Sequence, residues 1–150
     1  MVNLIKNREE LVEKVKYVAE QTSKLTINIV GVDFSIHSLT IFSHEEKEFE
    51  NLKNILFEIG EPFNENNGPR VVLNSPINTG KNKITHLRIR KPDTERPQVG
   101  CNDFDTDYYS FKEKYLLKYP DNLRLIQRPD YEMIEFYDSK FDVLAYVVSE

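Results

Sequence analysis

The sequence lacks features that are typical of secreted and membrane proteins. Cys101 is the only cysteine among 150 residues, which excludes an internal disulfide and any metal site built from paired cysteines. The chain has no apolar run long enough to cross a membrane, and its first residues contain no apolar signal-peptide core. We therefore expect a cytoplasmic protein with no membrane partner.

The chain also has no excess of positive charge. It contains 25 Asp and Glu residues against 20 Lys and Arg residues, which gives a formal net charge of -5. A protein that binds nucleic acid through bulk charge needs a basic face that neutralises phosphates, so we expect no nucleic-acid partner. A chain of this length can bury its own hydrophobic core, and we predict a single domain that spans residues 1–150.

The first 42 residues show a helical pattern followed by an extended one. Apolar residues recur at helical spacing from Leu11 to Ala19, and Asn7 is a suitable N-cap, which predicts an amphipathic helix over about 8–22. Between residues 25 and 42, β-branched and aromatic side chains dominate. This composition predicts two extended segments joined by a bend near Gly31.

Two modules with a similar order of elements follow this helix. The first covers about 34–90 and contains a strand, a helix that ends at Gly60, and two further strands. The second covers about 98–148 and contains a strand, a helix and three strands. We predict an α+β fold in which two β-α-β-β-β-like modules form a half-open cup of mixed sheet, with the N-terminal helix packed outside it.

Short motifs in both modules resemble those of a known superfamily. The start of module one reads "IHSLTIF", and the end of module two reads "MIEFYDSKFDVLAYVV". These segments resemble the vicinal-oxygen-chelate superfamily, which includes glyoxalases, bleomycin-resistance proteins and extradiol dioxygenases. The strand start "DFSIH", a helix ending in Gly-Glu and a strand running into Lys-Pro are similar to its YecM-like branch. The resemblance implies that both modules close into one cup.

The resemblance also implies a metal site. In that superfamily, His and carboxylate side chains from the first and last strands of each module hold a divalent ion and leave positions open for two substrate oxygens. His37 matches the first-strand ligand, and His86 lies in the closing strand of module one. Module two departs from the pattern, and it offers Glu135 as a third ligand and Asp103 as a fourth. The implied ion is Zn, Ni, Mn or Fe.

Strand alternation gives a separate view of the same region. Neighbouring side chains of a strand point to opposite faces, so His86, Arg88 and Arg90 should share one face, and Glu135 and Tyr137 should share another. If these faces line the cup, Arg88 can bind a small acid or phosphate through two hydrogen bonds, with Arg90 and Tyr137 as further substrate contacts. The alternative is that these faces meet solvent.

Two functional hypotheses follow from these observations. The first is a metal-binding protein, or a metal-dependent enzyme of lyase, isomerase or dioxygenase type, that acts on a small oxygen-rich substrate. The second is a metal-free module that binds and sequesters a small molecule in the same cup. The filled ligand positions of module one favour the first hypothesis, and the missing histidine of module two favours the second. Exposed sheet edges would also allow a homodimer.

Overall fold

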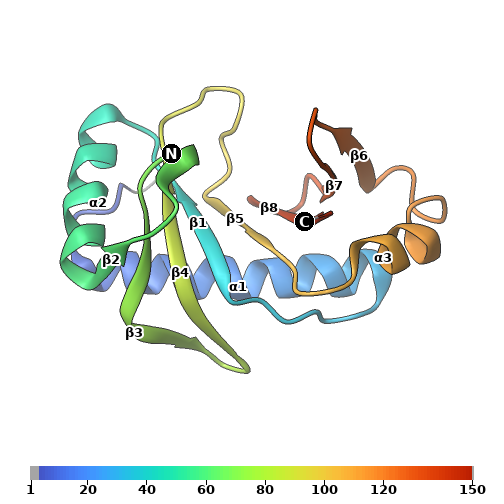
Figure 1. Cartoon of the computed structure of the whole chain (residues 1–150), viewed down its shortest axis with the longest axis horizontal. Helices are drawn as coiled ribbons and strands as arrows, with labels where there is room; N and C mark the ends of the chain where they lie inside the picture. Colours follow the sequence, from blue (N-terminus) through green and yellow to red (C-terminus); the bar gives the residue numbers. More distant parts are fainter. Residues whose placement is uncertain (1–3, 150) are drawn as a thin grey trace.

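A computed structural model describes residues 4–149 of the chain. The long helix α1 (Arg8–Val30) precedes two modules that lie side by side (Figure 1). The first module contains β1 (Ser38–Phe42), α2 (Glu46–Ile59), β2 (Gly60–Pro62), the 3-10 helix η1 (Glu65–Asn67), β3 (Arg70–Thr79) and β4 (Asn82–Arg90). The second contains β5 (Gly100–Asp103), α3 (Tyr108–Tyr115), β6 (Leu123–Gln127), β7 (Glu132–Phe136) and β8 (Val143–Val148).

The strands form one mixed sheet with the order β2-β3-β4-β1-β5-β8-β7-β6. Within each module the first strand pairs parallel with the last, β1 with β4 and β5 with β8. The two modules join through the antiparallel pair β1–β5, in which Leu39 lies opposite Asn102. The predicted α+β fold with paired β-α-β-β-β modules is confirmed. Strand β2 was not predicted, and it completes the first module.

Helix α1 is longer than its sequence pattern predicts. The extended structure predicted from residue 25 is wrong as far as Val30, because the apolar face of the helix continues through Leu25 and Ile29, which are buried. Ile27 is 48% exposed, as helical spacing requires. The helix ends at Gly31, whose φ of +79° is left-handed and whose backbone N–H donates to the carbonyl of Ile27 at 2.9 Å.

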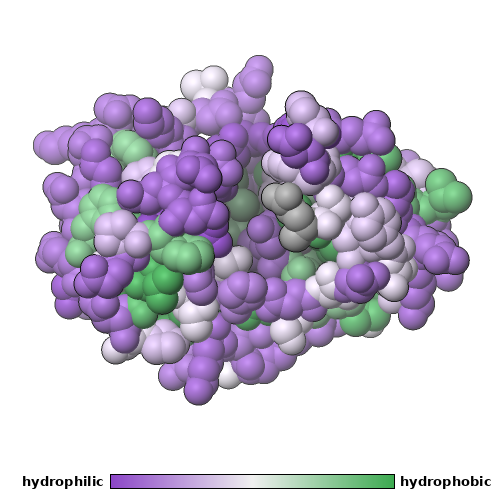
Figure 2. All heavy atoms as spheres, viewed as in Figure 1, coloured by the Kyte–Doolittle hydropathy of each residue, from purple (hydrophilic) through white to green (hydrophobic). Residues whose placement is uncertain are grey.

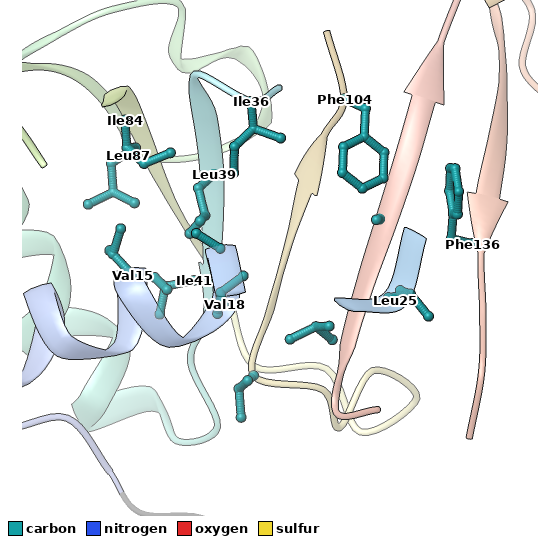
Figure 3. Packing of buried hydrophobic residues seen from close by; sticks show 14 of the residues in the cluster. Val15, Val18, Leu25, Ile36, Leu39, Ile41, Ile84, Leu87, Phe104 and Phe136 are labelled. Atoms are coloured by element: carbon teal, nitrogen blue, oxygen red, sulfur yellow. The ribbon is translucent and has the colours of Figure 1, made fainter. Parts of the chain in front are cut away.

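All three helices pack on one face of the sheet, where the hydrophobic core lies. Helix α1 crosses behind both modules and contacts strands of each (Figure 1). Val15 and Val18 of α1 lie beside the strands of module one, whereas Leu25 lies on the side of module two (Figure 3). Within residues 4–149, no helix combines the length and the apolar character that spanning a bilayer requires.

A glycine at the junction of the modules lets α1 approach the sheet closely. A Cβ atom added to Gly100 would lie 2.6 Å from the carbonyl oxygen of Thr40 and 2.9 Å from Cγ2 of Val18. Both distances are shorter than van der Waals contact, so a larger residue at this position would push α1 or β1 away. The close approach keeps the central strands of both modules against one helix.

The opposite face of the sheet carries the polar side chains, and we call it the cup face. On β4, Leu87 and Ile89 are fully buried toward the helices. His86, Arg88 and Arg90 point the other way, as strand alternation predicted, and all three line a cavity. The helices thus bury one side of the sheet and leave the concave side open to a ligand.

Candidate functional site

A cavity of about 850 Å³ opens on the cup face between the two modules. The space-filling view shows a hollow at this position, with hydrophilic residues around its rim (Figure 2). Among the described residues, its wall contains five of the seven arginines of the chain and none of the thirteen lysines. These arginines are Arg70, Arg88, Arg90, Arg96 and Arg128. The cavity is therefore locally basic in a chain whose net charge is negative.

Two of these arginines face each other across neighbouring strands. Arg70 of β3 lies directly opposite Arg88 of β4 in the antiparallel register. Like charges in this position repel each other and destabilise the strand pair. The Nε atom of Arg88 is also buried and has no hydrogen-bond partner among the described residues. Arg70 stacks on the ring of Phe63, with its guanidinium carbon 5.4 Å from the ring centroid.

Two other arginines have carboxylate partners. Arg90 forms an ion pair with Asp93 at 3.3 Å, and its guanidinium group stacks on Phe42 at 5.1 Å from the ring centroid. Arg96 comes from the loop between β4 and β5 and forms an ion pair with Glu135 at 3.0 Å. The positive charge of these two residues is thus balanced by carboxylates in direct contact.

Glu135 of β7 is fully buried and serves as a counter-ion. Its carboxylate accepts hydrogen bonds from Arg96 at 3.0 Å, from the hydroxyl of Tyr146 at 2.9 Å and from Arg124. Burial alone would raise the pKa of Glu135, but these hydrogen bonds outweigh burial and hold the pKa below its ordinary value. The cluster ties the loop after β4 to the second module.

His37 and His86 lie together at the start of β1, with ring centroids 5.6 Å apart. The Nδ1 atom of His37 lies 2.8 Å from the carboxylate of Asp105, which can only accept a hydrogen bond. The Nδ1 atom of His86 lies 2.8 Å from the hydroxyl of Thr85, and that hydroxyl donates to the carbonyl of His37. In its neutral form each ring would therefore carry its proton on Nδ1 and present Nε2 as an acceptor.

Two titratable groups near these rings are shifted toward their neutral forms. Burial lowers the pKa of His86, and the charges of Arg70 and His37 lower it further. Desolvation raises the pKa of Asp103 against the opposing charges of Arg88 and Arg70. Asp103 is exposed to the cavity, but protein surrounds it closely enough for desolvation to dominate. Asp103 is thus the carboxyl group whose charge acts on Arg88 and Arg70 at the floor of the cup.

The three side chains predicted to hold a metal do not converge. His37 and His86 are neighbours, but Glu135 lies on β7, which is separated from β4 by β1, β5 and β8. Glu135 is also committed to its own hydrogen-bond donors. In the part of the chain from residue 4 to 149, no three His, Cys, Asp or Glu side chains group closely enough to hold a metal ion. The predicted three-ligand set does not fit this arrangement, whereas the two histidine rings lie next to each other.

The remaining predicted residues have different locations. Arg88 and Arg90 line the cavity, whereas Tyr137 follows the end of β7, is 44% exposed and lies outside the cavity wall. Cys101 is buried on the cup face, and burial raises its pKa to about 12, so the thiol is not poised as a nucleophile.

Arg70 and Arg96 of the cavity wall were not identified as site residues from the sequence. Arg70 lies at the start of β3, and Arg96 lies in the loop between β4 and β5. The fold brings both to the cup face. The available signal was the distribution of arginine, because four of the seven arginines fall between residues 70 and 96.

No protein-family model and no curated protein matches the chain. Among solved structures, it is similar to one described as structural-genomics protein EC4020. The two share 12% sequence identity with a TM-score of 0.65, and the alignment covers 98% of this chain and 92% of that chain. At this identity the likeness shows the fold alone, and it agrees with the α+β architecture.

Proposed function

We propose that the cup binds a small anionic molecule through the arginines of its inner face. The observation that carries this proposal is the Arg70–Arg88 pair, in which two positively charged groups face each other on β3 and β4. Arg88 lines the cavity and its side chain is only partly buried, so its guanidinium group can reach such a ligand. An anion between the two groups would remove their repulsion.

The use of arginine in place of lysine supports an oxygen-rich anion. The planar guanidinium group binds a carboxylate or phosphate through two parallel hydrogen bonds, which the lysine ammonium does not do. All the cationic side chains of the cavity wall other than histidine are arginines among the described residues. The ligand class that fits this wall is a carboxylate or a phosphate. Binding without chemistry is sufficient to explain the arrangement.

Isothermal titration calorimetry tests this proposal. Inorganic phosphate, sulfate and acetate would be titrated separately at constant ionic strength into the wild-type protein and the Arg88→Gln variant. Arg8→Gln is the matched control, because Arg8 lies on α1 outside the cavity and forms an exposed ion pair with Glu58 at 3.7 Å. The control removes the same charge from a surface that the proposal does not involve.

We expect wild type to bind at least one of these anions. Loss of a charge-assisted, two-point contact should weaken binding by about tenfold or more in Arg88→Gln. Arg8→Gln should bind like wild type. The proposal is wrong if wild type binds none of the three anions, or if both variants lose affinity equally.

A metal-dependent role is a second candidate, favoured by the orientation of the two histidines. A neutral imidazole with its Nδ1 proton held by another group presents Nε2 to a metal, and the Asp105–His37 contact at 2.8 Å is of the kind that orients such ligands. His37 and His86 would hold Zn, Ni, Mn or Fe, and oxygen atoms of the anionic ligand would complete its coordination. The chain would then resemble vicinal-oxygen-chelate proteins that act on small oxygen-rich substrates.

Elemental analysis of untagged protein after incubation with zinc or nickel tests this second candidate. A bound ion should be lost in both His37→Ala and His86→Ala. His44→Ala is the control, because the His44 ring is bonded to the backbone carbonyl of Gln98 at 2.9 Å, away from the histidine pair. Metal that is absent from wild type, or retained in both of the first two variants, would contradict the metal-dependent role.

A further inference from the structure

We infer that the ligand of the cup is an amphipathic anion, with a phosphate or carboxylate head bound by module one and an apolar body bound by module two. This inference rests on the proposed function and specifies its ligand class. It comes from a difference between the two walls of the cavity. Module one contributes uncharged polar side chains, the buried Leu39 and five charged or titratable side chains, which are His37, Arg70, His86, Arg88 and Arg90.

Module two lines the same cavity with the charged residues Asp103, Asp105 and Arg128, and it also contributes exposed apolar surface from its strands. Met133 of β7 and Val148 of β8 lie in its wall, and both are only partly buried. Tyr131, which precedes β7, is also partly exposed in the wall. The charge of Glu135 beneath this wall is balanced by its hydrogen-bond donors, so it does not oppose an apolar group.

These side chains belong to an apolar cluster that is separate from the main core. Its buried members are Phe42, Cys101, Leu144 and Tyr146, against which Ile126, Met133 and Val148 pack. The cluster lies on the cup face, because Leu144 and Tyr146 alternate along β8 with residues of the main core. None of the helices α1, α2 and α3 covers this face, because all three pack on the other side of the sheet. The exposed parts of the cluster therefore remain available to a ligand.

The two walls favour opposite ends of one molecule. An anionic head gains most at the Arg70–Arg88 pair, where two positive charges lie on opposite strands. An apolar body gains by removing Met133 and Val148 from water. The cavity of about 850 Å³ has room for both parts together. A wholly apolar ligand would leave the arginines unsatisfied.

Calorimetric titrations of three probes test the inference at about pH 8, where each probe is largely a dianion. The probes are inorganic phosphate, phenyl phosphate and hexyl phosphate, which share the head and differ in the body. We expect at least one of the two organic phosphates to bind wild type about tenfold more tightly than inorganic phosphate. Met133→Gln should reduce that ratio toward one. Leu117→Gln, at a side chain that is 92% exposed and outside the cavity, should not change it.

The outcomes separate this inference from the proposed function. Equal affinity of wild type for all three probes, with weaker binding in Arg88→Gln, overturns the amphipathic ligand and leaves anion binding intact. The inference is also overturned if the preference for an organic phosphate over inorganic phosphate persists in both Met133→Gln and the near-isosteric variant Val148→Thr. If Met133→Gln does not fold, Val148→Thr alone decides the question. Failure of wild type to bind any probe overturns the proposed function, and the inference falls with it.

Discussion

At the scale of single residues, the buried and half-buried charged side chains of this protein are of two kinds. Glu135 is surrounded by donors, so its charge is favourable in the folded state. Arg88 faces another arginine, and its Nε atom has no partner among the described residues. The first arrangement stabilises the fold. The second costs stability, and a bound anion would recover that cost.

Replacing Glu135 with Gln should destabilise the protein in a pH-dependent way. The folded-state pKa lies below the ordinary value of 4.5, so the stabilising effect is complete above about pH 4.5 and is lost as the pH falls through the folded-state pKa. At pH 7 we expect a loss of about 2 kcal/mol in the free energy of unfolding, which shrinks under acidic conditions. Urea denaturation at several pH values measures both effects.

Glu113→Gln is the control for this prediction, because Glu113 is exposed on α3. That variant should unfold like wild type at every pH. A loss for Glu135→Gln that stays constant from neutral to strongly acidic pH would show that the carboxylate charge is not what stabilises the cluster.

The pKa of His86 is a direct probe of the charge around it. Burial and the nearby charges of Arg70 and His37 lower this pKa, so His86 should titrate below its ordinary value of 6.5. A bound anion would offset the charge of Arg70 and should raise the pKa again. The chain has three histidines, so NMR titration of the imidazole signals with and without inorganic phosphate can resolve each one. A His86 pKa above 6.5 in the free protein would contradict the described electrostatics.

At the scale of elements, substitutions in the C-terminal third of α1 can show whether that segment is helical or extended. In a strand, Ile27 and Ile29 would share one face, whereas in the helix Ile29 is 7% exposed and Ile27 is 48% exposed. Ile29→Ala should therefore lower the free energy of unfolding by about 2 kcal/mol or more. Ile27→Ala should change it by less than about 0.5 kcal/mol. Chemical denaturation compares the two, and equal losses would argue against the helix.

The same segment shows why sequence patterns predict some elements and not others. Helix α2 could be predicted because its apolar stripe, from Phe49 to Leu56, has helical spacing throughout. The region after Leu25 has many β-branched residues, whose intrinsic preference for strands is weak and is overridden by packing. In α1, burial of Leu25 and Ile29 against the sheet decides the conformation. That burial exists only once the sheet has formed.

At the scale of the whole molecule, alternation along one strand could be predicted, but the convergence of several strands could not. The sequence was sufficient to place His86, Arg88 and Arg90 on one face of β4. It could not place Arg70 opposite Arg88, because that contact depends on the register of β3 and β4. It also could not separate Glu135 from the histidines, because their distance depends on strand order. The superfamily resemblance implies that His37, His86 and Glu135 hold one metal ion together. In the fold, the two histidines lie side by side, and three strands separate Glu135 from His86.

The most direct test of anion binding in the cup is a ¹H–¹⁵N NMR titration of the arginine side chains with inorganic phosphate. The chain has seven arginines, so the Nε–H signals are few enough to assign by substitution. We predict that the signals of Arg88 and Arg70 shift with phosphate concentration and reach saturation, while that of Arg8 stays in place. An unchanged Arg88 signal, or equal shifts for all seven arginines, would contradict the account.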